Sequence, residues 1–136
     1  MHSRKKIIFF LVGVAACTAP PPPPGSAGPA EAVQEFSAAL QRGDTATAWS
    51  LLSANAQRQA EAQASAARAA AGDGGPDSGR TMLFSSALPG RAVEARLVSQ
   101  SGDSAEVQTA EDGGPTRSWR IQRENGRWRV DLKLGD

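Results

Sequence analysis

The stretch ENGR near the C-terminus constrains the fold of this chain more than any other short segment. Asn125-Gly126 is a dipeptide favoured in type I′ hairpin turns, because both central residues of such a turn need positive φ. A turn of two residues also fixes which residues of the flanking strands face each other. The pairs expected on the inner face are Trp119 with Leu132, Ile121 with Val130, and Arg123 with Trp128, where the arginine would cover the indole.

The outer face of this hairpin carries the arginines of the C-terminal region. Cross-strand pairs contribute tenths of a kcal/mol to ~1 kcal/mol each, so we interpret this face as largely self-neutralised and exposed to solvent. An anionic-ligand site is the alternative, and Arg117 and Arg129 are the cations left over for it. The pairs expected on the outer face are Arg120 with Asp131, Gln122 with Arg129, and Glu124 with Arg127.

Residues with period two upstream indicate a second hairpin, so we expect antiparallel strands across 92–134. Val93, Ala95 and Leu97 alternate with polar residues, as do Ala105, Val107 and Thr109. For both sets to share a face, the loop between them must have three residues, Ser101-Gly102-Asp103, with Leu97 opposite Val107.

The region before the strands has the period of helices, which we expect at 30–43, 45–53 and 54–71. Gly43 suits the end of the first helix and Asp44 the N-cap of the second, so we interpret the tripeptide RGD as a helix junction rather than an adhesion motif. The inward residues expected from these two helices are Val33, Phe36, Ala39, Leu40, Ala48, Leu51 and Leu52, with Trp49 beside them.

The third helix has an inward face of alanines, which buries little area, so we expect that helix to be exposed. Its stripe would be Ala56, Ala60, Ala64, Ala67 and Ala71. A flexible loop is expected at 72–80 because of its glycines. A short packed segment would follow, with Met82, Leu83, Phe84 and Leu88.

The N-terminal segment is too short to cross a membrane. Its apolar run, 7–16, has ten residues, whereas a bilayer core of ~30 Å needs about twenty in a helix. Basic residues precede the run and Val14-Ala15-Ala16 ends it, which is the pattern of a secretory signal peptide. Because Cys17 follows directly, the segment resembles the lipobox of bacterial lipoproteins.

That resemblance implies a signal peptide at 1–16, cleavage between Ala16 and Cys17, and a diacylglyceryl thioether on Cys17. An ordinary cleaved signal with an incidental cysteine is the alternative. Residues 17–29 would then form a lipidated, proline-rich tether, since prolines 20–24 favour polyproline II. The implied location is the cell envelope, on the periplasmic side of the outer membrane if the cell is Gram-negative.

The charge of the chain argues against a nucleic-acid partner. The chain has 15 basic and 14 acidic residues, and loss of Arg4, Lys5 and Lys6 with the signal leaves a net charge of −2. Nucleic-acid binding needs a dense basic surface.

The helices followed by strands resemble the nuclear transport factor two-like superfamily, which includes the SnoaL-like proteins. VQEFSAALQRGDTATAWSLLS is similar to the opening helices of small exported members, and ENGRWRVDL to their last hairpin. The resemblance covers about 30–136. It implies an α+β domain in which N-terminal helices pack on a curved antiparallel sheet of four or more strands, of the cystatin-like or cone type. The apolar residues that could line a pocket are Phe36, Trp49, Trp119 and Trp128.

Catalysis is not expected, although some relatives are isomerases or dehydratases. The single histidine, His2, lies in the expected signal, and Ser85-Ser86 has no base partner. By strand parity Glu94 and Glu106 point outward, and Glu111 and Asp112 lie in a turn, so no inward acid is available for proton transfer. No metal-ligand cluster or phosphate loop is evident, and no cofactor is expected.

The function expected from the sequence is a lipid-anchored, non-catalytic interaction domain. Its partners would be the membrane through the lipid, and an envelope protein or a second copy through the sheet face. The alternative is small-molecule binding in the apolar cone.

Replacing the lipobox cysteine tests the anchor. We expect Cys17→Ser to block both cleavage before residue 17 and labelling with palmitate, and globomycin to block cleavage in the wild type. The measurements are the precursor size on gels and radiolabelled palmitate incorporation. Ordinary maturation of the variant would contradict the lipoprotein prediction.

Overall fold

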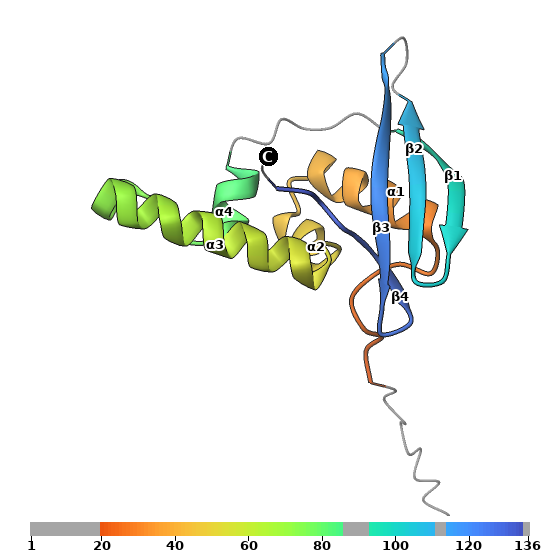
Figure 1. The fold of residues 1–136 in the computed structure, drawn as a ribbon, viewed down its shortest axis with the longest axis horizontal. Helices are drawn as coiled ribbons and strands as arrows, with labels where there is room; N and C mark the ends of the chain where they lie inside the picture. Colours follow the sequence, from red (N-terminus) through yellow and green to blue (C-terminus); the bar gives the residue numbers. More distant parts are fainter. Residues whose placement is uncertain (1–19, 86–92, 111–113, 135–136) are drawn as a thin grey trace, which may run out of the picture.

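The computed structural model describes residues 20–85, 93–110 and 114–134. This part of the chain forms an α+β fold in which helices pack with one four-stranded antiparallel sheet, in the order β1-β2-β3-β4 (Figure 1). The elements in chain order are α1 (Pro29–Gln41), α2 (Thr45–Ser50), α3 (Ala54–Ala71), the 3-10 turn η1 (Gly72–Gly74), α4 (Gly79–Phe84), β1 (Glu94–Ser101), β2 (Ser104–Ala110), β3 (Thr116–Glu124) and β4 (Arg127–Val130).

The main core lies between α1 and the inner face of the sheet. Helix α1 contacts all four strands, and Val33 and Phe36 on its buried face meet Val107 and Ile121 of the sheet. Leu51 and Leu52, after α2, close one end of this core. Burial of each such side chain contributes roughly 1.5–3 kcal/mol, so this layer contributes much of the apolar burial that holds the sheet and first helices together.

The RGD tripeptide forms the helix junction expected for it. Gly43 ends α1 with φ of +69°, a conformation that favours glycine. Asp44 caps α2, since its Oδ1 accepts from the Thr47 N–H at 3.1 Å and its Oδ2 from the Thr47 hydroxyl at 2.6 Å. These bonds, with the nearby Arg42 charge, lower the pKa of the Asp44 carboxyl.

The C-terminal hairpin has the predicted register. Asn125 and Gly126 have φ of 52° and 76°, and Ile121 pairs with Val130 and Arg123 with Trp128. The prediction that Trp119 pairs with Leu132 is wrong, because β4 ends at Val130 and the chain then leaves the sheet.

The first hairpin reaches the predicted pairing by a different route. Leu97 lies opposite Val107, as expected, but the loop has two residues, because Ser101 pairs with Ser104. A β-bulge between Leu97 and Ser99 supplies the extra residue. One inserted residue reverses the parity of a strand, and this bulge does what the expected third loop residue would have done.

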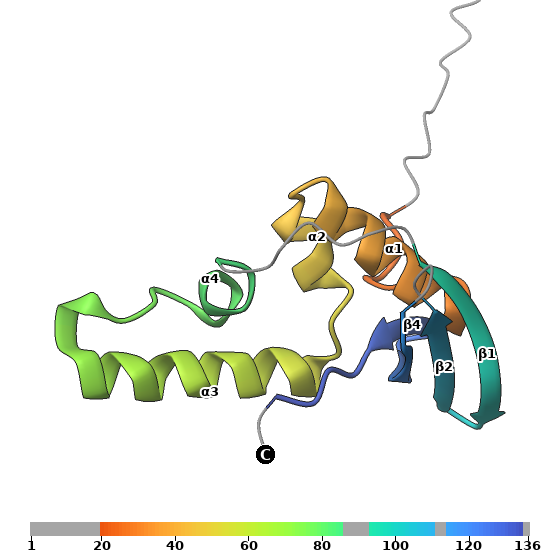
Figure 2. The ribbon, with the colours of Figure 1, turned by 90° about the horizontal axis from the view of Figure 1, so that it is seen from above.

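The alanine stripe of α3 is more buried than expected. Ala56, Ala60 and Ala64 are fully buried, whereas Ala67 is half-buried and Ala71 exposed. Helix α4 packs along α3, and a Cβ on Gly79 would lie 2.6 Å from the Ala60 carbonyl carbon. Small residues on both helices therefore allow close approach, and the pair projects away from the sheet (Figure 2).

The segment expected as a flexible loop, 72–80, holds η1 and the start of α4. The Arg68 guanidinium ties it to α3 by donating to the backbone oxygens of Pro76 and Asp77, at 3.0 and 2.7 Å. The packed segment after it includes half-buried Leu83 and Phe84, and Leu88 lies outside the described residues.

The fold begins before residue 30, which corrects the expected boundary of the tether. Ser26 is fully buried and pairs with Trp128 of β4 through two backbone hydrogen bonds of 2.8 and 2.9 Å. The Arg127 guanidinium donates to the Gly25 oxygen at 2.7 Å. Residues 25 and 26 thus cover the outer edge of β4, a role that needs long-range backbone pairing and has no local signal in the sequence.

A methyl group at Gly25 tests this corrected boundary. Gly25 has φ of +127°, and a Cβ there would lie 2.7 Å from the Arg127 Cβ. We expect Gly25→Ala to lower the free energy of unfolding by about 1–3 kcal/mol in urea denaturation. The matched control is Gly102→Asn, because Gly102 has φ of +59° and open space around it; its change should stay under ~1 kcal/mol. Equal stabilities for both variants would contradict the boundary.

Candidate functional site

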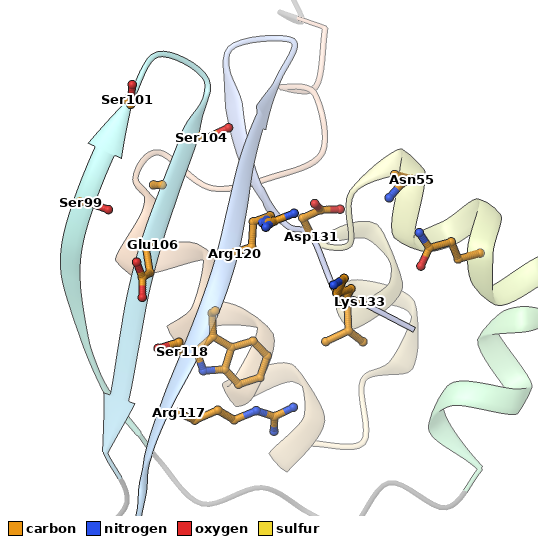
Figure 3. Close-up of a pocket in the computed structure, with 14 residues that line it drawn as sticks. Asn55, Ser99, Ser101, Ser104, Glu106, Arg117, Ser118, Arg120, Asp131 and Lys133 are labelled. Carbon is orange, nitrogen blue, oxygen red and sulfur yellow. The ribbon is translucent and has the colours of Figure 1, made fainter. Parts of the chain in front are cut away.

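An open groove of about 820 Å³ lies between the sheet and the first turns of α3. The sheet contributes hydroxyls and one acid, and Figure 3 shows Arg120 pointing from β3 toward Asp131 on the opposite wall. Asn55 and Gln59 of α3 form part of that wall. The residues contributed by the outer face of the sheet are Ser99, Ser101, Ser104, Glu106, Ser118 and Arg120.

The groove exists because the chain leaves the sheet after β4. Residues 131–134 run toward α3, where the Gln59 Oε1 accepts from the Leu134 N–H at 3.3 Å. The Gln63 side-chain amide donates to the Leu134 oxygen at 3.1 Å. These two glutamines hold the C-terminal segment against α3, and Leu132 and Lys133 of that segment line the groove.

A polar junction fixes the start of α3 against the hairpin. Ser53 caps the helix by accepting from the Ala56 N–H at 3.1 Å, and its hydroxyl donates to Asp131 Oδ1 at 2.7 Å. The Glu124 carboxylate accepts from the Ala54 N–H at 3.1 Å. It also accepts from Arg129 at 2.8 Å. The junction places two walls of the groove at a fixed distance.

Gln122 lies opposite Arg129 and Glu124 opposite Arg127, as predicted for the outer face of the hairpin. The junction changes only the side-chain ion pairs expected from these positions. Glu124 pairs diagonally with Arg129 instead of directly with Arg127. Asp131 receives the Ser53 hydroxyl, and no ion pair within the described residues joins it to Arg120. Arg129, expected to be left over, is buried in the junction. The exposed backbone N–H groups at the start of a helix attract carboxylates, and a hairpin considered alone lacks that competing partner.

Arg117 lines the groove near the start of β3. Its guanidinium carbon is 4.4 Å from the centroid of the Trp119 ring, a distance at which the cation and the ring attract each other. Arg117 is exposed, and so is Lys133 on the facing segment. The groove lining therefore presents these two cations to solvent.

The four residues expected to line an apolar pocket occupy different surroundings in the structure. Phe36 and Trp128 are 3% and 4% exposed and pack in the core with half-buried Trp49. The Phe36 ring lies 6.1 Å from Trp119 and 6.4 Å from Phe84, and Arg123 covers Trp128 at 5.2 Å. Trp119 alone among the four borders the groove.

The remaining predicted residues are placed as follows. Ala16 and Cys17, the expected cleavage and lipidation site, lie outside the described residues, as do Glu111 and Asp112. Glu94 and Glu106 are exposed, which agrees with their parity. Within the described ranges no group of three potential metal ligands is present, and no helix there is both long and apolar enough to cross a membrane.

Sequence reasoning missed the groove itself, although a signal was available. Ser99, Ser101, Ser104 and Ser118 are outward-facing hydroxyls on three neighbouring strands. The alternation of the strands places these serines on one exposed face, but serine is commonly exposed in proteins, so they mark that face only weakly. The opposing wall has no local signal, since it depends on the docking of α3.

Comparison of the chain with protein-family models, with curated proteins and with solved structures finds no match.

Loss of the junction carboxylate tests its role. Glu124→Ala would leave Arg129 buried without its ion-pair partner and remove a cap from α3. Breaking a fully buried pair costs 3–5 kcal/mol, and because the Glu124 side chain is 23% exposed we expect a loss of about 2–3 kcal/mol of unfolding free energy. Asp103→Asn is the control, since its pair with Arg123 is exposed and should contribute under ~1 kcal/mol. Similar losses for both would contradict the junction.

Proposed function

We propose that this chain is a lipid-anchored protein of the cell envelope whose α+β domain binds a partner non-catalytically through the groove. The observation that carries the proposal is the groove itself, an open site of about 820 Å³ with hydroxyl and amide side chains on facing walls. Such side chains offer directional hydrogen bonds to a polar partner, and the open shape admits a chain rather than an enclosed small molecule.

The N-terminal sequence supports the anchor. Basic residues, an apolar run of ten and a small-residue end before Cys17 are the order that lipoprotein processing uses. Described residues 20–24 are exposed prolines. A lipidated cysteine followed by a stiff spacer would hold the domain away from the bilayer.

The place where the chain enters the fold supports binding away from the membrane. Gly25 contacts Arg127 beside the turn of the β3–β4 hairpin, whereas Arg117 and Ser118 line the groove near the start of β3. With ~3.3 Å per residue, the two ends of β3 are about 25–30 Å apart. The groove would then face an envelope component beyond the anchoring membrane.

The carboxylates of the groove support a binding role rather than catalysis. The Asp131 oxygen accepts from Ser53 within the polar junction, so it serves to position α3. Glu106 is exposed to water, whereas a general acid or base is tuned by desolvation.

We also propose that the domain is a small member of the cone-shaped, nuclear transport factor two-like class. The features that favour this assignment are α1 on the inner face of an antiparallel sheet and a last strand opened by Asn125-Gly126. Small-molecule binding in an apolar cone is the second candidate. The groove volume lies within the 300–1,000 Å³ of ligand sites, but its polar lining and the packed aromatics favour a partner chain.

Photo-crosslinking in intact cells tests the proposed function. A benzophenone amino acid at Ser101, in the groove, should give a discrete crosslinked product, and Arg120→Ala in the same chain should weaken it at least threefold. The matched control places the probe at Gln34, an exposed residue of α1 remote from the groove. Equal products from Ser101 and Gln34, or none from Ser101, would argue against a groove partner.

A further inference from the structure

β3 is longer than β4, and the difference leaves part of its edge open inside the groove. β3 spans Thr116–Glu124, whereas β4 ends at Val130, opposite Ile121. The last bond between the two sides runs from the Asp131 N–H to the Arg120 oxygen, at 2.9 Å. Beyond it, residues 116–119 have no strand on this side among the described residues.

The alternation of a strand decides which backbone groups face the open side. Successive residues direct their N–H and C=O groups to opposite neighbours. The Arg120 oxygen bonds toward the β4 side, whereas the Arg123 N–H bonds to Asp103 on the β2 side. Ser118 and Thr116 have the parity of Arg120, so their backbone donors and acceptors point toward the groove.

The outer edge of β4, unlike the open edge of β3, is covered by other segments of the chain. Ser26 pairs with Trp128 along it, and the Leu51 oxygen and Ser53 N–H bond to Val130. Two segments of the chain thus cover the outer edge of β4. The open length of β3 stands beside a covered edge, and it borders the groove through Arg117, Ser118 and Trp119.

We propose that the groove binds an extended peptide segment of a partner protein, which pairs as an added strand with residues 116–119. This inference rests on the proposed function and names its class of ligand. Main-chain hydrogen bonds supply affinity in this mode, and side chains on alternate positions supply specificity. At ~3.3 Å per residue, the open edge fits four or five residues.

The charges beside the open edge of β3 indicate that the peptide is acidic. Arg117 and Lys133 line the groove and are exposed, while Arg120 is directed toward Asp131 (Figure 3). Glu106 is the remaining acid of the groove lining. A carboxylate on the added strand would therefore meet two cations with little opposition.

Binding is tested with linear peptides selected from a phage-displayed random library on the full-length chain in detergent. Selected peptides should be enriched in Asp or Glu, and N-methylation at every second position should weaken binding about tenfold, as expected for a lost main-chain hydrogen bond. The intervening positions should tolerate methylation within about twofold, because their N–H groups point away from β3.

Two substitutions at one position separate main-chain from side-chain recognition. Ser118→Pro removes the backbone N–H and should weaken peptide binding about tenfold, whereas Ser118→Ala keeps it and should bind like the wild type. Because proline could disturb β3, amide exchange provides an independent measurement, and peptide should slow exchange of the Ser118 and Thr116 amides in the wild-type chain.

Arg117→Glu should lower affinity for acidic peptides, with Arg42→Glu as the matched surface control.

Several outcomes would overturn the strand-addition proposal. These are equal affinity of the Ser118→Pro and wild-type chains, insensitivity to N-methylation, unchanged exchange at Ser118, or binding of soluble cell-wall glycan strands in place of peptides. A crosslink from Ser101 that persists in Ser118→Pro would leave the groove as a binding site while removing this mode. Loss of every groove crosslink would instead remove the proposed function.

Discussion

The polar junction at the start of α3 is the interaction on which the groove depends. Glu124 binds the first backbone N–H of the helix and the Arg129 guanidinium together, and Ser53 links the helix cap to Asp131. Charge-assisted bonds of this kind are stronger than neutral ones, and Arg129 is almost fully buried. The junction therefore sets the position of a long helix whose other contacts are mainly with α4.

The divergence of the chain after Val130 follows from this arrangement. Asp131 satisfies one bond to β3 and one to Ser53, and beyond it Leu134 bonds to α3 through Gln59 and Gln63. A strand that continued along β3 would lose these partners. The same divergence leaves the backbone of residues 116–119 unpaired on this side. The groove and the open edge of β3 therefore have one structural origin.

Local patterns predicted the hairpins and helices with different success. Asn125-Gly126 determines its turn through backbone sterics alone, and the register of β3 and β4 follows from it. The first hairpin lacks such a turn. Its loop is one residue shorter than predicted, and a bulge near Val98 adds one residue to β1, so that Leu97 still pairs with Val107. Ion pairs were predicted less well, because Glu124 found a better partner in a helix end that is distant in the sequence.

The sequence by itself determined the α+β class, the α3 range, the Asp44 cap and the register of the last hairpin, because each depends on periodicity or on the backbone preference of one or two residues. The tertiary structure alone decided that Ser26 covers β4, that Glu124 binds the start of α3, and that a polar groove opens beside β3. These features arise from contacts between segments far apart in the chain. Their energies depend on which groups compete for the same donor or the same space.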